Sequence, residues 1–138
     1  MLMSGIEWVV DAQGCAAEKL RSPECLRSLF DQIVRDLHLQ PIGQTIWHQF
    51  PDAGGITGLC LLAESHLACH TFPEFGSLCL NLFCCVARAE WDFETELKRA
   101  VGATAVTVRA VVRAYGMNEV LAVAVAGDAH ATHEGREG

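Results

Sequence analysis

The 138-residue sequence has few basic residues, no Cys-x-x-Cys pair and no apolar run long enough to cross a membrane. It contains 10 lysines and arginines against 17 aspartates and glutamates, a formal net charge of −7. Nucleic-acid binding depends on clustered positive charge, and no such cluster is present, so this class of function is not predicted. The acidic balance is compatible with a cationic small-molecule ligand, but it does not by itself indicate one.

Seven cysteines are present, an odd number, at positions 15, 25, 60, 69, 79, 84 and 85. Without a Cys-x-x-Cys pair a structural zinc site is not predicted. The first residues lack the basic and apolar regions of a secretory signal, so we expect reduced thiols in a cytoplasmic protein. Free cysteines in apolar segments pack as small hydrophobic residues, which we expect of Cys69, Cys79 and Cys84.

The chain length suits a single domain, which we expect to span residues 1–116. Residues 117–138 are then a C-terminal extension, in which 120–126 could form a last edge strand and the polar end is expected to be disordered. Hydrophobic residues make up 51% of the sequence. Because this is high for a soluble monomer, part of the surface is expected to pack against another subunit.

The hydrophobic pattern predicts two helices and five strands. One helix begins at Ser22-Pro23 and ends near His38, and the other spans 91–101 and stops at Gly102. The strand-like segments are 6–12, 45–50, 56–63, 77–85 and 104–115. We expect residues 64–71 to continue the extended segment 56–63, and residues 72–76 to form a turn.

These elements predict an α+β fold, a two-layer sandwich of a mostly antiparallel sheet with both helices on one face. The other face should then be apolar and need a cover. A second copy of the sheet is the simplest cover, so a homodimer is expected.

Residues 63–76 place a serine, two histidines and two carboxylates between apolar runs. A histidine can activate the hydroxyl of Ser65 as a nucleophile. An ordinary surface serine, or one hydrogen-bonded in the core, explains the same residues. Along a strand, His66 and His70 share one face and Ser65 lies on the other, so Ser65 would meet His70 only if the chain bends. The residues by themselves leave these alternatives open.

The central segment resembles the signature of the bacterial S-adenosylmethionine decarboxylase proenzymes. The resemblance rests on Glu-Ser-His-Leu at 64–67, His-Thr-Phe-Pro-Glu at 70–74, and Gly76. It extends over roughly residues 6 to 115 through Gly14-Cys15, His48-x-Phe50, 55–58 and Phe83-x-Cys85.

What the resemblance implies is self-cleavage of the bond between Glu64 and Ser65. The Ser65 hydroxyl would attack the Glu64 carbonyl, and β-elimination and hydrolysis would convert Ser65 into a pyruvoyl group. The ketone of such a group forms a Schiff base with a substrate amine and accepts the electrons left by departing CO2.

The resemblance also implies roles for three further residues. His70 matches the base that removes a proton during β-elimination. Thr57 matches a hydroxyl that stabilises the intermediate of the acyl shift. Cys85 matches the acid that protonates the substrate carbon, for which a thiol is suited because it can donate near neutral pH.

Phe50, Leu67 and Glu74 are the candidate substrate-binding residues. A substrate cation over the Phe50 ring would gain about 0.5–2 kcal/mol. Glu74 could attract the same positive charge. A solvated carboxylate explains Glu74 equally well. Glu7 is a weaker candidate, because a solvated carboxylate is the favoured explanation of it.

The implied function is decarboxylation of S-adenosylmethionine for spermidine synthesis by a homodimer of processed protomers, without metal, nucleic acid or membrane. Four positions depart from the family pattern: Asn81 replaces a common acid, Val86 replaces a glycine, and Phe75 and Ser77 replace residues that are more often His or Tyr. These departures leave open a pyruvoyl-dependent decarboxylase of arginine or ornithine. A non-processing homologue that regulates a partner subunit is a further alternative.

Overall fold

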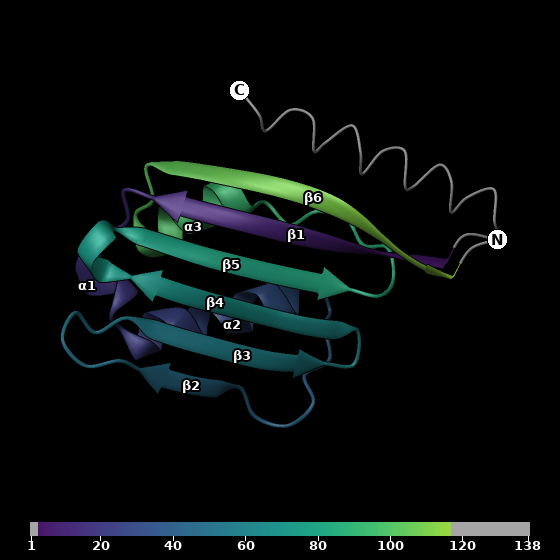
Figure 1. Ribbon diagram of the computed structural model, residues 1–138, viewed down its shortest axis with the longest axis horizontal. Helices are drawn as coiled ribbons and strands as arrows, with labels where there is room; N and C mark the ends of the chain where they lie inside the picture. The colour runs from purple at the N-terminus through teal and green to yellow at the C-terminus, as the bar shows by residue number, and fades with distance from the viewer. Residues whose placement is uncertain (1–2, 117–138) are drawn as a thin grey trace.

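The computed structural model describes residues 3–116 as one six-stranded sheet with three helices on one of its faces (Figure 1). The strand order is β2-β3-β4-β5-β1-β6, and each neighbouring pair is antiparallel. The strands are β1 (Met3–Gln13), β2 (Ile46–Gln49), β3 (Ile56–Leu62), β4 (Ser65–Phe72), β5 (Ser77–Cys84) and β6 (Ala105–Gly116). The helices are α1 (Ala17–Leu20), α2 (Pro23–Asp36) and α3 (Phe93–Val101), with a 3-10 turn η1 (Pro73–Phe75). The predicted α+β sandwich is confirmed.

The two predicted helices are α2 and α3, and a side chain caps the first turn of each. The Ser22 side chain accepts the Cys25 N–H at the start of α2, and Asp92 accepts the Thr95 N–H at the start of α3. Hydrogen bonds from Thr95 lower the pKa of Asp92. Gly102 ends α3 with a φ of +72°, a conformation that glycine adopts without strain. Helix α1 has only four residues, too few for a hydrophobic pattern to predict it.

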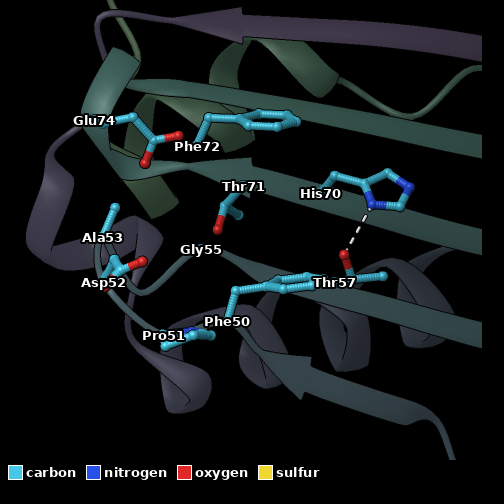
Figure 2. Close-up of a pocket in the computed structure, with 10 residues that line it drawn as sticks. All are labelled: Phe50, Pro51, Asp52, Ala53, Gly55, Thr57, His70, Thr71, Phe72 and Glu74. Carbon is cyan, nitrogen blue, oxygen red and sulfur yellow. Dashed lines mark hydrogen bonds between the residues drawn. The ribbon is translucent and has the colours of Figure 1, made fainter.

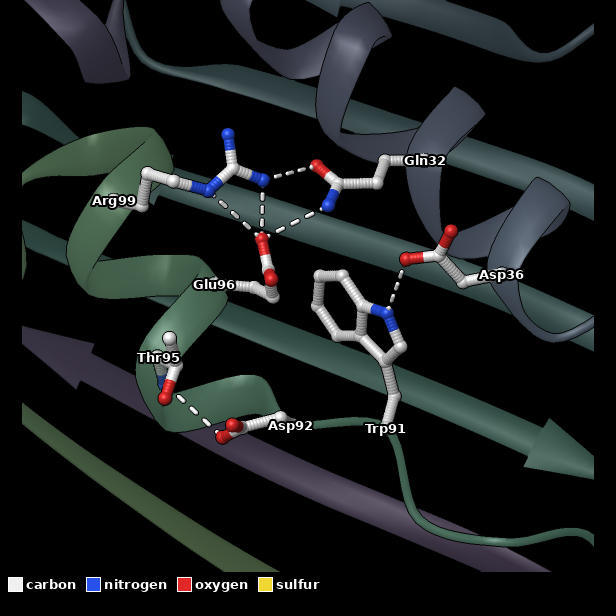
Figure 3. A network of polar contacts seen from close by, with 7 residues as sticks. All are labelled: Gln32, Asp36, Trp91, Asp92, Thr95, Glu96 and Arg99. Atoms are coloured by element: carbon white, nitrogen blue, oxygen red, sulfur yellow. Dashed lines mark hydrogen bonds and ion pairs between the residues drawn. The ribbon is translucent and has the colours of Figure 1, made fainter.

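Polar contacts tie the two long helices together on the outside of the core (Figure 3). Trp91 donates its indole N–H to Asp36 at 2.9 Å, and the Gln32 amide donates to Glu96 at 2.8 Å. Arg99 pairs with the same Glu96 carboxylate. No helix within residues 3–116 is both long and apolar enough to cross a membrane.

The core lies between the sheet and the helices. Trp8 on β1 is one of its largest side chains, is 2% exposed, and is 6.3 Å from the Phe93 ring, measured between ring centroids. Leu67, Leu80 and Leu82 extend this apolar layer across β4 and β5. Alternate residues of each strand therefore face the helices, as the period of two requires.

Replacing Trp8 with alanine is expected to lower the free energy of unfolding by about 3–5 kcal/mol, because it leaves a cavity in the core. Denaturant unfolding followed by circular dichroism measures this change. Val112→Ala is the control, because Val112 is 59% exposed, and its effect should stay within about 0.5 kcal/mol. Equal effects of the two substitutions would contradict this account of the core.

The sheet face opposite the helices, called the open face below, is not uniformly apolar, so that prediction was wrong. Ion pairs join β1 to β6 across it: Asp11 with Arg109 at 2.7 Å, and Glu7 with Arg113 at 2.9 Å. Its apolar part lies toward β2 and β3, where large side chains are exposed: Ile46, Leu59 and Leu61. A pattern of alternating residues identifies which side chains share a face, but it does not identify ion pairs between distant strands.

One detail of the strand prediction was wrong: residues 65–72 are extended, but they form a separate strand, β4, and do not continue β3. The chain reverses at Ala63-Glu64, so Leu62 pairs with Ser65 and β4 runs back beside β3. This turn contains no Gly, Pro, Asn or Asp, which are the usual turn residues, so the sequence did not indicate it. The expected extension at 117–138, including a strand at 120–126, lies outside the described residues.

Candidate functional site

Strand β4 carries the expected functional residues at two separate places. Ser65 is its first residue and pairs with Cys84, whereas His70 pairs with Thr57 and Cys79 further along the strand. Ser65 and His70 are five positions apart along the extended chain, which is roughly 16 Å. The strand does not bend to bring them together, so the site within one chain has two parts.

The first part is the turn between β3 and β4. The Cys85 N–H donates to the carbonyl oxygen of Glu64 at 2.7 Å, and the Cys85 carbonyl accepts the Tyr115 hydroxyl at 2.7 Å. A hydrogen-bond donor aimed at a carbonyl oxygen stabilises negative charge that develops there. Ser65 has a φ of +153°, a conformation favourable only for glycine, and such strain costs about 1–3 kcal/mol.

The second part lies on the open face at the other end of β4, where Thr57 Oγ1 and His70 Nδ1 are 2.9 Å apart (Figure 2). This hydrogen bond fixes the orientation of the imidazole ring. A hollow of about 430 Å³ lies beside the pair, and Phe50, Phe72 and Glu74 line it. It therefore combines aromatic rings, a carboxylate, a hydroxyl and an imidazole.

A smaller hollow of about 120 Å³ lies on the open face and is lined by His70, Cys79 and Asp11, among others. Burial raises the pKa of the Cys79 thiol, and the neighbouring Asp11 carboxylate raises it further. Cys79 was predicted to lie in the core, and this was wrong, because its side chain lines the open face. Apolar neighbours in sequence do not distinguish the two faces of a strand.

His66 also lies on the open face, at the Ser65 end of β4. Its Nε2 atom is 2.7 Å from Oδ1 of Asn81, and its ring is 5.8 Å from the Phe83 ring, between centroids. Asn81, noted as a departure from the family pattern, therefore fixes the orientation of this imidazole ring.

The candidate substrate-binding residues are placed differently from one another. Phe50 is 51% exposed and borders the larger hollow with Glu74. Leu67 is fully buried on the helix side of the sheet, so its side chain does not reach that hollow. Glu7 is paired with Arg113 and is not free for a cationic ligand.

The adjacent cysteines at the end of β5 differ in their surroundings. Cys84 is fully buried, and burial raises the pKa of its thiol, an effect that nearby Arg88 partly offsets. Cys69 is buried as predicted, and burial raises its pKa to about 12. Cys85 follows the strand and is half-buried beside the β3–β4 turn.

Sequence reasoning missed several residues at that turn. Tyr115 contacts Cys85, Arg88 pairs with Glu64, and the Gln40 N–H donates to the same Glu64 carboxylate. Each comes from a different part of the chain, so no motif could reveal them. Within residues 3–116, no group of three or more His, Cys, Asp or Glu side chains is arranged to hold a metal ion.

Comparison with known proteins agrees with the resemblance of the motif. The family model described as S-adenosylmethionine decarboxylase matches residues 6–114. The S-adenosylmethionine decarboxylase proenzyme of Archaeoglobus fulgidus is 32% identical over 100 residues, which cover 71% of this chain and 88% of that protein. The proenzyme of Thermoplasma volcanium is 31% identical over 122 residues, 84% of this chain and 92% of that protein.

A similar fold has been solved by crystallography. The adenosylmethionine decarboxylase from Aquifex aeolicus VF5 superposes with a TM-score of 0.70 at 23% identity, over 86% of this chain and 98% of that one. At this level of identity the match shows the fold.

Proposed function

This chain belongs to the S-adenosylmethionine decarboxylase family, and from this premise we propose that it makes a pyruvoyl cofactor from its own Ser65. Its activity is the decarboxylation of S-adenosylmethionine, which the family and the named relatives support. No comparison favours arginine or ornithine as the substrate. We place the catalytic domain at residues 1–116.

The observation that carries the proposal is the hydrogen bond from the Cys85 N–H to the Glu64 carbonyl oxygen, next to the strained φ of Ser65. In the first step the Ser65 Oγ attacks the Glu64 carbonyl carbon, the C–N bond breaks, and the hydroxyl proton ends on the freed amine. Negative charge develops on the oxygen that Cys85 already contacts. Breaking the peptide bond also lets Ser65 relax.

In the second step a base removes the α-proton of Ser65, and the carboxylate of Glu64 leaves with the electrons of the ester C–O bond. Water then hydrolyses the resulting dehydroalanine and releases ammonia, which leaves a ketone. We assign the base to His70, held by Thr57 at 2.9 Å. Because His70 of the same chain lies roughly 16 Å away along β4, the base must come from a second copy.

A homodimer with the two open faces packed about a two-fold axis would meet this need. A two-fold contact is self-complementary, so the His70 end of one sheet can face the Ser65 end of the other. The exposed Ile46, Leu59 and Leu61 supply apolar surface for such a contact. Each dimer would then contain two composite sites.

The pyruvoyl group supplies a ketone that accepts the electrons released when CO2 leaves. Phe50 and Glu74 line a hollow of about 430 Å³, a volume within the usual range for small-molecule sites. They would bind the sulfonium cation through the ring face and the carboxylate. Cys85 would then return a proton to the substrate carbon. The product would serve spermidine synthesis in the cytoplasm.

The test is the denatured mass of freshly purified protein, with Ser65→Ala as the control. We expect two fragments that divide between Glu64 and Ser65, the second with a pyruvoyl terminus, and a single intact chain for the variant. The processed protein should release CO2 from S-adenosylmethionine and not from arginine or ornithine. A wild-type chain that stays intact for days would contradict self-cleavage and favour a regulatory homologue.

A further inference from the structure

An ion pair outside the family motif holds the side chain of Glu64. Its Oε2 atom lies 3.0 Å from Nη2 of Arg88, and its Oε1 atom accepts the backbone N–H of Gln40 at 3.1 Å. The Glu64 side chain is 12% exposed and that of Arg88 is 21% exposed. Both carboxylate oxygens of the residue at the expected cleavage point are therefore occupied, largely out of solvent.

Arg88 is itself anchored to the end of a helix. From the loop between β5 and α3, its Nη1 donates to the carbonyl oxygen of Leu37 at 2.6 Å, directly after α2. The carbonyl end of a helix attracts a cation. Two of the guanidinium nitrogens of Arg88 are therefore held, one by Leu37 and one by Glu64.

The backbone of the same turn is held as well. Ala63 donates its N–H to the Gln40 carbonyl at 2.8 Å, and the Glu64 carbonyl accepts the Cys85 N–H at 2.7 Å. Rotation of the Glu64 peptide group would break the Cys85 contact. With its side chain fixed by Arg88, Glu64 is restrained against that rotation, and the strained Ser65 is restrained against relaxing before cleavage.

We propose that Arg88 is a positioning residue for self-cleavage, because its ion pair with Glu64 keeps the scissile carbonyl against the Cys85 amide and within reach of the Ser65 hydroxyl. This inference rests on the proposed function, since it concerns the cleavage step itself. Arg88 contacts none of the reacting atoms and acts only through the Glu64 side chain.

The experiment follows self-cleavage after synthesis in a cell-free system, by denaturing electrophoresis and mass measurement over time. Arg88→Gln and Glu64→Gln should each slow cleavage by about tenfold to a hundredfold, the range for a small misplacement of reacting groups. The double variant should be no slower than the slower single variant, because both remove the same interaction. Arg88→Lys, which keeps the charge, should recover part of the rate.

Arg99→Gln is the matched control, because it breaks the exposed pair with Glu96 on α3 (Figure 3) and should cleave at the wild-type rate. Thermal unfolding of each variant in the Ser65→Ala background separates misfolding from slow cleavage. If Arg88→Gln does not fold, the cleavage rates of Glu64→Gln and Arg88→Lys test the role of the ion pair.

Wild-type rates for Arg88→Gln and Glu64→Gln would overturn the role of Arg88 while leaving the proposed function intact. Multiplying effects in the double variant would overturn it too, because the two residues would then act independently. A wild-type chain that never cleaves would overturn both proposals.

Discussion

Co-expression of His70→Ala with Ser65→Ala is expected to restore processing of the His70→Ala chain, although neither variant completes processing alone. A mixed dimer contains one complete site, with Ser65 from one protomer and His70 from the other. Random pairing puts up to about half of the His70→Ala chains in such dimers, because the two-fold contact does not distinguish the variants. Distinct affinity tags and denatured masses measure the processed fraction.

The matched control replaces the Ser65→Ala partner with one that carries both substitutions, so that no His70 is present in any dimer. The His70→Ala chain should then stay unprocessed. Equal processing with both partners would contradict a site shared between protomers. It would require a rearrangement that brings Ser65 and His70 of one chain together across roughly 16 Å of strand.

The His70→Ala chain by itself should stop after the first step, because the acyl shift does not need the base that removes the α-proton. An ester has the same mass as the intact chain, so mass alone does not reveal it. Hydroxylamine, which cleaves esters, should divide the chain between Glu64 and Ser65. Resistance to hydroxylamine would place His70 in the first step instead.

The second large effect is expected from Cys85→Ala, which should lower the decarboxylation rate of the processed enzyme by about 10²–10⁴-fold. Self-cleavage should remain, because the contact with the Glu64 carbonyl comes from the backbone N–H of Cys85 and alanine keeps that donor. The side chain and the backbone of one residue would thus serve different reactions. Release of CO2 per processed chain measures decarboxylation, and the fragment masses measure self-cleavage.

Cys25→Ala is the control for this prediction, because Cys25 lies on α2 and its thiol contacts the Ala100 carbonyl on the helix side. It should decarboxylate at the wild-type rate. Cys84 is unsuited to replace Cys85 as the donor, since it is fully buried and burial raises its pKa. A Cys85→Ala enzyme with full activity would show that another group donates the proton.

Much of this fold could be read from local patterns. Ser22 caps α2 and Gly102 ends α3, as the sequence predicted, because these residues satisfy or release backbone groups within one turn. Alternation along the strand placed His66 and His70 on one face and Ser65 on the other. Helix caps and strand alternation depend only on residues within about four positions of one another, so they can be identified from the sequence alone.

The sequence by itself also indicated which chemistry to expect, because the segment from Glu64 to Glu74 resembles the motif of the S-adenosylmethionine decarboxylase proenzymes. Only the tertiary structure decided how Ser65 and His70 are arranged. The reversal at Ala63-Glu64 puts Ser65 at one end of β4 and leaves His70 at the other. The contacts of Arg88 with Glu64 and of Tyr115 with Cys85 join residues 24 and 30 positions apart. Such contacts follow from strand register and helix packing, which a local pattern does not specify.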